Sequence, residues 1–211
     1  MDIKALRREY ASRSLEESAI QPDPIQQFRT WFDEAVRSEI LDANAMALAT
    51  VSDEGLPSAR TVLLKDIDDR GLVFFTHYNS PKGHDLISHP HASLLFYWAP
   101  LERQVRVTGI VEQVPAAESD AYFASRPRDS QIAAWAARQS SELPNRAALE
   151  QRYEQLVAQY DGQPVPRPPD WGGYRVVPHR VEFWQGRPRR LHDRVLYVKS
   201  GGGWRRTRLA P

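Results

Sequence analysis

The sequence of 211 residues contains no cysteine. That absence excludes disulfides, thiolate metal sites and cysteine nucleophiles. An excess of charge of either sign is missing as well, because 28 lysines and arginines stand against 27 aspartates and glutamates. A chain this close to neutral has no global field that would draw it to nucleic acid or to an acidic membrane. Any anion site must therefore be local.

Long apolar runs are also absent. No stretch approaches the length needed to cross a bilayer, and the first residues, MDIKALRREY, lack the hydrophobic segment of a secretory signal. We therefore expect a cytoplasmic protein that binds neither membrane nor nucleic acid.

Several catalytic motifs are missing too. The sequence has no Gly-rich phosphate loop, no G-x-S-x-G elbow and no dinucleotide fingerprint, so hydrolase and nucleotide-kinase readings have no support. The histidines His77, His84, His89 and His91 match neither H-E-x-x-H nor a facial triad. We therefore expect no metal site.

The N-terminal part of the chain changes character at Asp23. Residues 1–22 are polar and aperiodic, which predicts a mobile segment before a single domain over residues 23–211. Asp23 followed by Pro24 is a helix start, and apolar residues then recur at helical spacing. The pattern predicts an amphipathic helix over about residues 24–40.

Most of the remaining chain has β character. Short β-type runs separated by turn residues predict an antiparallel meander that closes into a small barrel, at 46–51, 58–67, 72–76, 92–98 and 104–114. Further strands are expected at 174–185, 194–199 and 204–209. Helices are expected over about 81–87, between Pro115 and Pro127, from a cap at Asp129 or Ser130 to Arg138, and after Asn145. The sequence thus predicts a mainly β fold with peripheral helices.

One stretch, Glu182 to Arg194, is unusually rich in functional side chains. It reads EFWQGRPRRLHDR and holds four arginines, a histidine and a tryptophan around a Gly/Pro bend. Guanidinium and imidazole groups suit phosphate and polar rings, and an indole offers a flat apolar wall. The stretch is suited to a charged, planar small molecule. The alternative is a hairpin with a solvated basic tip.

Two other places carry cations beside polar groups. Arg60 and Lys65 would face opposite sides of a regular strand, so one ligand could touch both only through a bulge, a strand end or a second subunit. Tyr122, Arg126 and Ser130 lie at a helix break and could bind a phosphate. The alternatives are surface cations for the first pair and ordinary helix capping for Ser130.

Ordered motifs along the chain carry a family resemblance. They are LRREY at 6–10, R-x-VLLK at 60–65, LERQV at 101–105, SRPRDSQI at 125–132, EFWQG at 182–186 and RLHDR at 190–194. Over nearly its whole length the sequence resembles the pyridoxamine 5'-phosphate oxidase family.

The resemblance implies an FMN-binding split β-barrel that works as a homodimer, with each flavin at the subunit interface. The implied enzyme is a pyridoxal 5'-phosphate synthase, a flavin-dependent oxidoreductase. It oxidises pyridoxamine 5'-phosphate and pyridoxine 5'-phosphate to pyridoxal 5'-phosphate by hydride transfer from C4' to flavin N5, with O2 as electron acceptor and H2O2 as product.

The resemblance also implies roles for residues. FMN would be held by Arg60, Thr61, Val62, Leu63, Leu64, Lys65, Phe75, Thr76, Lys82, Gln104, Gln139, Ser140, Trp184 and Arg194. The substrate would meet Arg7, Tyr10, Lys65, Tyr122, Arg126, Ser130, Arg190, Leu191 and His192. Of these, Arg190 and His192 are the expected catalytic residues, orienting the substrate over the flavin.

Two positions depart from the family pattern. Pro81 stands where relatives carry an arginine, which removes a guanidinium near the expected FMN phosphate and predicts weaker FMN retention. Phe75 replaces a usual tyrosine. Three alternative functions remain open: a phenazine-pathway oxidase of the same barrel, a non-catalytic FMN or pyridoxal-phosphate carrier, and a nucleic-acid binder, which the balanced charge disfavours.

Overall fold

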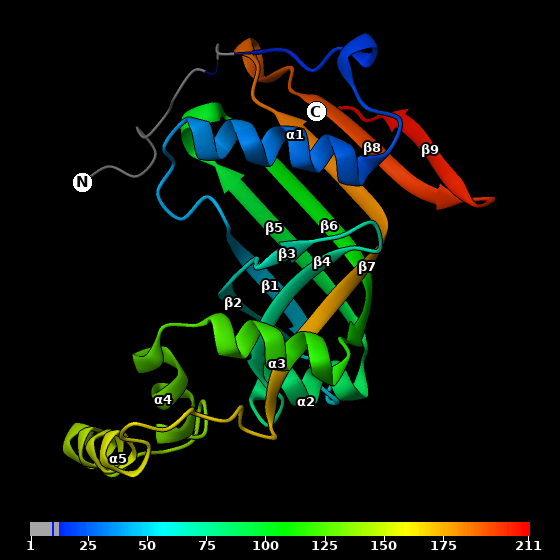
Figure 1. The fold of residues 1–211 in the computed structure, drawn as a ribbon. Helices are drawn as coiled ribbons and strands as arrows, with labels where there is room; N and C mark the ends of the chain where they lie inside the picture. The colour runs from blue at the N-terminus through cyan, green and yellow to red at the C-terminus, as the bar shows by residue number, and fades with distance from the viewer. Residues whose placement is uncertain (1–9, 11–12) are drawn as a thin grey trace, which may run out of the picture.

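The computed structural model describes Tyr10 and residues 13–211, and over that part of the chain nine strands form one curled antiparallel sheet (Figure 1). The strands are β1 Ala45–Val51, β2 Pro57–Leu63, β3 Asp66–Ile67, β4 Leu72–His77, β5 His91–Trp98, β6 Arg103–Gln113, β7 Trp171–Gln185, β8 Asp193–Ser200 and β9 Gly203–Arg208. Their order is β2-β1-β5-β6-β7-β4-β3, with β8 beside β7 and β9 beside β8.

The long strand β7 organises the sheet. Its first half, from Trp171, pairs with β4, and its second half, up to Gln185, pairs with β8. Strand β6 pairs with β7 along its whole length, with a register shift between Thr108 and Gly109. Because bulges increase local twist, this irregularity suits a sheet that curls rather than lies flat.

Five α-helices lie around the sheet within the described residues. They are α1 Pro24–Arg37, α2 Pro81–Ser88, α3 Ala116–Ser125, α4 Arg128–Ala136 and α5 Arg146–Gln159. The helix α1 crosses the sheet near β5, β6 and β8, whereas α2 and α3 lie near the opposite end (Figure 1). The predicted mainly β fold with peripheral helices is confirmed. No helix in the described part of the chain is both long and apolar enough to span a bilayer.

The core forms where α1 meets the sheet. Phe28 and Trp31 of α1 are buried and pack edge-on against Phe96 of β5 and Phe183 of β7. A second, smaller cluster lies under the peripheral helices, and it includes Trp171 of β7. The alternating burial along β6 explains why its sequence has a period of two.

Three local predictions differ from the structure. The predicted strand 58–67 is interrupted, because β2 ends at Leu63 and β3 begins at Asp66. The cap expected at Asp129 or Ser130 is wrong, since α4 begins at Arg128, after Pro127, with no side-chain cap. The first helix is shorter than predicted and ends at Arg37.

The later part of the N-terminal segment, from Arg13 to Pro22, contacts the main core. Leu15 and Ile20 are buried in the main core, and the Leu15 amide donates to Asp193 of β8 at 3.0 Å. From Arg13 onward, therefore, the segment expected to be mobile is packed on the domain. Of its earlier residues, Tyr10 alone is described, and Arg7 lies outside the described residues.

Candidate functional site

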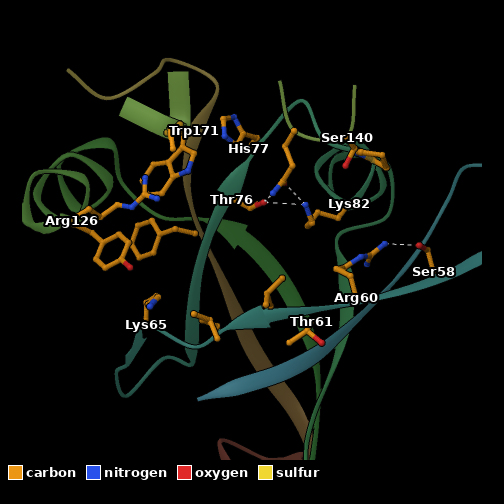
Figure 2. A pocket seen from close by; sticks show the side chains of 18 of the residues that line it. Ser58, Arg60, Thr61, Lys65, Thr76, His77, Lys82, Arg126, Ser140 and Trp171 are labelled. Carbon is orange, nitrogen blue, oxygen red and sulfur yellow. Dashed lines mark hydrogen bonds between the residues drawn. The ribbon is translucent and has the colours of Figure 1, made fainter. Parts of the chain in front are cut away.

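A cavity of about 740 Å³ opens between β2, β4, the start of α2 and the break between α3 and α4 (Figure 2). It gathers residues that are far apart in the sequence. Those predicted from the sequence are Arg60, Thr61, Val62, Leu63, Lys65, Phe75, Thr76, Lys82, Tyr122, Arg126, Gln139 and Ser140. The sheet and the peripheral helices therefore bring together most of the predicted flavin contacts and much of the predicted substrate phosphate site.

The charge of the cavity has one sign. Four cations line it, namely Arg60, Lys65, Lys82 and Arg126, and no aspartate or glutamate is among the lining residues of the described chain. Figure 2 shows Arg60 and Lys82 on one side and Arg126 with Lys65 on the other. Cations gathered without carboxylates in a concave site attract anions. The cavity thus has two cationic ends.

Lys82 is the most buried of these cations, with 7% of its surface exposed. Its ammonium donates to the Thr76 hydroxyl at 3.2 Å, to Ser80 Oγ at 3.1 Å and to Gln139 Oε1 at 2.5 Å. All three acceptors are neutral, so burial is not offset by a carboxylate. Burial, and then the neighbouring charge of Arg60, lowers the pKa of Lys82 to about 8.

The start of α2 places Lys82 in the cavity. Ser80 caps the helix by accepting from the Gly83 amide, and Pro81 occupies the first turn. Proline suits that position because its fixed φ is helical and it has no N–H to leave unpaired. The backbone at this point would also favour an anion, since a helix N-terminus carries partial positive charge.

Arg60 is held rigidly by oxygen acceptors. Its Nη1 donates to the Leu48 carbonyl at 3.1 Å and to Thr50 Oγ1 at 2.7 Å, and its Nη2 donates to Ser58 Oγ at 2.6 Å. Asp85 of α2 lies 3.9 Å from Nη2. Burial lowers the pKa of Arg60, while Asp85 acts in the opposite direction. The guanidinium is therefore fixed before any ligand arrives.

Arg126 carries the other end of the cavity. It follows the last residue of α3, and its guanidinium lies 4.8 Å from the centroid of the Trp171 ring. Its Nη1 is buried and has no hydrogen-bond partner within the described chain. Tyr122 stacks on Phe75 at 4.0 Å, and Phe75 lies nearly parallel to Trp171. A half-buried guanidinium with one buried nitrogen that lacks an acceptor, beside an aromatic stack, fits an anionic ligand group.

The interruption between β2 and β3 answers the question of how Arg60 and Lys65 share a site. Lys65 follows the end of β2, and its amide donates to the Val73 carbonyl of β4 at 2.8 Å. A regular strand would have turned the two side chains to opposite faces. Of the three explanations that the sequence left open, the strand end is the one found, and it needs no second subunit.

A second group of predicted residues lies elsewhere, at the far end of β7. Trp184 and His192 have ring centroids 4.7 Å apart, and Tyr10 packs edge-on against both, at 5.7 and 5.5 Å. His192 Nδ1 accepts from the Arg187 amide at 3.1 Å. Burial and then Arg190 lower the pKa of His192, against a smaller opposing effect of Asp193. We call Tyr10, Trp184 and His192 the aromatic cluster.

The turn beside this cluster has an unfavourable backbone. Arg189 and Arg190 have φ angles of 58° and 60°, in the left-handed region that side chains other than glycine rarely adopt. Leu191, next to them, is 65% exposed. Backbone strain of this kind clusters at functional sites, which makes the turn a candidate binding element.

Arg194 and Gln104 lie on the same face of the sheet as Trp184. Gln104 is opposite Trp184 on β6, and Arg194 is opposite it on β8. Arg194 is paired within the chain, because its Nε and Nη2 lie 2.9 and 2.8 Å from the buried Glu182 carboxylate. In this chain, then, Arg194 orders the sheet face beside the aromatic cluster.

The two groups are separated along one strand. Trp171, which lines the cavity, and Trp184 of the aromatic cluster are thirteen residues apart on β7. At roughly 3.3 Å per residue, the strand carries them about 40 Å apart. Figure 1 shows the same separation, with the β7–β8 turn at one end of the sheet and α2 and α3 at the other. One chain therefore does not bring the cationic cavity and the aromatic cluster together.

Two predicted residues lie away from the cavity for simple reasons. Leu64 is only 4% exposed and belongs to the main core. Ser130 lies inside α4, where its amide bonds to the Pro127 carbonyl, and it is not among the lining residues. Neither position is among the residues that line the cavity.

Sequence reasoning missed several lining residues. His77 and Trp171 are the most informative, since they lie on the neighbouring strands β4 and β7 and pair with each other in register. His77 Nδ1 is buried, lies 3.9 Å from Asp170, and has no hydrogen bond within the described chain. Trp171 begins the sequence W-G-G at 171–173, which was a usable signal, whereas His77 was considered only as a possible metal ligand. In the described part of the chain, no three His, Asp or Glu residues are arranged to hold a metal ion.

Comparison with known proteins agrees with this geometry. Residues 32–160 match the family model of pyridoxamine 5'-phosphate oxidase, and residues 171–211 match the pyridoxine 5'-phosphate oxidase C-terminal dimerisation region. The pyridoxine/pyridoxamine 5'-phosphate oxidase of Rubrobacter xylanophilus is 55% identical over 210 residues, which cover 100% of this chain and 97% of that protein. Its counterpart in Cupriavidus taiwanensis is 57% identical over 207 residues, covering 98% and 97%.

Two solved structures are similar in fold. PhzG from Burkholderia lata 383, in complex with tetrahydrophenazine-1-carboxylic acid, has a TM-score of 0.90 and 34% identity and covers 95% of this chain and 99% of its own. A pyridoxamine 5'-phosphate oxidase-related, FMN-binding protein from Nostoc punctiforme has a TM-score of 0.71 at 18% identity, covering 92% and 99%, and supports the fold alone. These likenesses confirm the predicted split-barrel fold.

Proposed function

Because the chain belongs to the pyridoxamine 5'-phosphate oxidase family, we propose that it oxidises pyridoxamine 5'-phosphate and pyridoxine 5'-phosphate to pyridoxal 5'-phosphate. The proposed cofactor is FMN, with O2 as the electron acceptor and H2O2 as the second product. The relatives named above, more than half identical over nearly the whole chain, support this choice.

The observation that carries the proposal is the cavity with two cationic ends. The flavin mononucleotide and the vitamin B6 substrate each bring one phosphate, so their shared site needs two separate sets of cationic donors. Arg60 and Lys82 supply one set, and Lys65 and Arg126 supply the other. The absence of a lining carboxylate among the described residues leaves these charges available to ligands.

The residues around Lys82 fit the flavin phosphate. Three neutral oxygens hold the Lys82 ammonium, and the Arg60 guanidinium is fixed by Leu48, Thr50 and Ser58. A pre-ordered cationic pair of this kind binds a dianion without first ordering its own side chains. Backbone around Thr61 to Leu63 lines the same wall and would face the flavin ring.

The residues around Arg126 fit the substrate phosphate. Arg126 Nη1 lacks a partner within the described chain, and Tyr122 offers a phenol on the same side of the cavity. Anchoring the phosphate there would orient the pyridine ring over the flavin, with Arg190 and His192 holding the ring from the other side. Held by these residues, FMN would supply the two-electron chemistry that moves a hydride from the substrate C4' carbon and returns the electrons to O2.

The separation along β7 leads us to propose that the functional unit is a homodimer with shared sites. The cationic cavity of one chain and the aromatic cluster of the same chain are too far apart to hold one ligand. A two-fold partner would bring its own β7–β8 turn to the first chain's cavity. The match of residues 171–211 to a dimerisation region supports this arrangement.

One experiment tests the activity. The purified protein is inspected for flavin absorbance, pyridoxine 5'-phosphate is added under air, and aldehyde and peroxide are followed together. We expect a yellow protein that makes both products in equal amounts. A protein without flavin, or a yellow protein that makes neither product, would exclude the oxidase and favour a carrier or a different substrate.

A further inference from the structure

A buried arginine outside the cavity links the two sides of the substrate phosphate site. Arg175 of β7 is 1% exposed, four residues beyond the cavity residue Trp171. Its Nη2 lies 2.8 Å from Asp68 Oδ2 and 2.9 Å from Glu118 Oε1, and its Nη1 lies 3.7 Å from Glu112. One guanidinium thus connects three carboxylates from three different elements.

Two of these carboxylates belong to the elements that carry the substrate phosphate cations. Asp68 begins the β3–β4 turn, three residues after Lys65. Glu118 lies in the first turn of α3, four residues before Tyr122 and eight before Arg126. Residues four apart on a helix share a face, so a shift of α3 at Glu118 also moves Tyr122.

The contact with Glu118 is reinforced by the next residue. Ser119 is fully buried, and its Oγ accepts from the Gly173 amide of β7 at 3.1 Å. The first turn of α3 is therefore fastened to β7 at two adjacent positions, whereas the end of α3 runs into the break that holds Arg126.

We propose that Arg175 is a positioning residue for the substrate phosphate site: through Glu118 it fixes the direction of α3, and so sets where Tyr122 and Arg126 meet the cavity. The proposal rests on the proposed function, because the anion placed by α3 is taken to be the substrate phosphate. Arginine suits this place better than lysine, since a guanidinium keeps its charge when it is buried, whereas the pKa of a buried lysine shifts readily.

The charges support a holding role rather than a ligand role. Arg175 is not among the residues that line the cavity, and the carboxylates around it neutralise it. A misplacement of a ligand-binding group by about 1 Å can cost about a hundredfold in rate, so a device that fixes a helix near the site has measurable consequences.

The matched test compares Glu118→Gln with Glu112→Gln. Both remove a negative charge beside the same guanidinium, but Glu112 lies on β6, whose position is already fixed by its backbone pairing with β5 and β7. We expect Glu118→Gln and Arg175→Met to raise the KM for pyridoxine 5'-phosphate by about tenfold, with kcat and the FMN Kd within about twofold of wild type. Glu112→Gln should change none of them, and Arg175→Lys should fall between.

A ligand-free measurement separates this proposal from the proposed function. Backbone amides of residues 116–125 should exchange with deuterium faster in Glu118→Gln than in Glu112→Gln, at equal urea midpoints. Equal exchange in the two variants would overturn the positioning role whether or not the protein is an oxidase. A wild-type protein without oxidase activity would overturn the proposed function. The exchange result would still show whether the contact between Arg175 and Glu118 holds α3.

Discussion

Lys82 shows how burial prepares a binding residue. An exposed lysine keeps its proton far above neutral pH, but the enclosed ammonium of Lys82 has neutral partners and a cationic neighbour, so its pKa falls to about 8. The charged form is therefore costly in the empty site and is stabilised when an anion enters. Ligand phosphate and proton should bind together.

This coupling predicts the pH dependence of FMN binding. The flavin phosphate is already a dianion above pH 7, and burial keeps the pKa of His77 low, so that histidine stays neutral in this range. Free Lys82 loses its proton as pH rises through about 8 and must regain it on binding. The FMN Kd of the apoprotein should therefore be flat below pH 8 and rise by up to about tenfold per pH unit above it.

The control for that measurement is Lys82→Arg, which keeps a charge that does not titrate. Fluorescence titrations of FMN between pH 7 and 9.5 should show the rise in wild type and a flat Kd in the variant. A wild-type Kd that does not change across pH 8 would contradict the assignment of Lys82 to the phosphate.

Arg190 and His192 test the division of roles at the β7–β8 turn. His192 belongs to the aromatic cluster and Arg190 is two residues before it, and both lie away from the pre-ordered Arg60 and Lys82. Arg190→Ala and His192→Ala should each lower kcat/KM for pyridoxine 5'-phosphate by at least about tenfold, a loss of about 1.4 kcal/mol in the transition state. The flavin content of both purified variants should stay near that of wild type. Loss of flavin in either variant would show that the residue binds the cofactor and not only the substrate.

At the scale of elements, the start of α2 decides how the flavin phosphate is held. Pro81 lines the cavity and has no side-chain donor, so the helix N-terminus and Lys82 must act without a second guanidinium there. Pro81→Arg should therefore tighten FMN binding by about tenfold or more, because a hydrogen bond to a charged group contributes roughly 1.5–3 kcal/mol.

Pro81→Ala is the matched control for this change. It removes the ring without adding a cation, and it should leave the FMN Kd close to that of wild type. Equal affinity in wild type and Pro81→Arg would show that the helix N-terminus and Lys82 already suffice.

The helices and strands also show which of their boundaries can be predicted from local sequence patterns. Asp23 before Pro24 and Ser80 before Pro81 are caps whose hydrogen bonds depend on neighbours within three residues, and both helices begin where these signals predict. The end of β2 could not be predicted from the sequence, because it depends on the hydrogen bond from the Lys65 amide to the Val73 carbonyl of β4. The start of α4 was misread because Asp129 and Ser130 are good caps in isolation.

At the scale of the whole molecule, the two groups of predicted site residues lie at opposite ends of β7. A shared dimer site makes a specific prediction for mixed variants. Arg126→Ala disables the cavity, and His192→Ala disables the turn, so a dimer of one chain of each has one doubly defective site and one intact site. Random mixing yields about half such heterodimers, and activity should recover to about a quarter of wild type.

The mixture is prepared by unfolding and refolding the two variants together, and each variant refolded alone is the control. Sedimentation confirms that dimers form in all samples. A mixture no more active than its components would place the complete site within one chain and contradict the shared arrangement.

By itself the sequence determined the element types, the family and most members of the site. Alternating burial, helix caps and the ordered motifs from LRREY to RLHDR are local properties, encoded within a few residues of each position. They sufficed to predict Arg60, Lys82 and Arg126 as binding residues, and all three line one cavity.

The tertiary structure alone decided how those residues act. The lowered pKa of Lys82 depends on its burial and on Arg60, 22 residues before it, and Glu118 of α3 is paired with Arg175, 57 residues beyond it. His77 became a lining residue only because β4 pairs with β7. Burial, charge balance and the distance between the cavity and the aromatic cluster are set by contacts between distant segments, and no local pattern of the sequence encodes them.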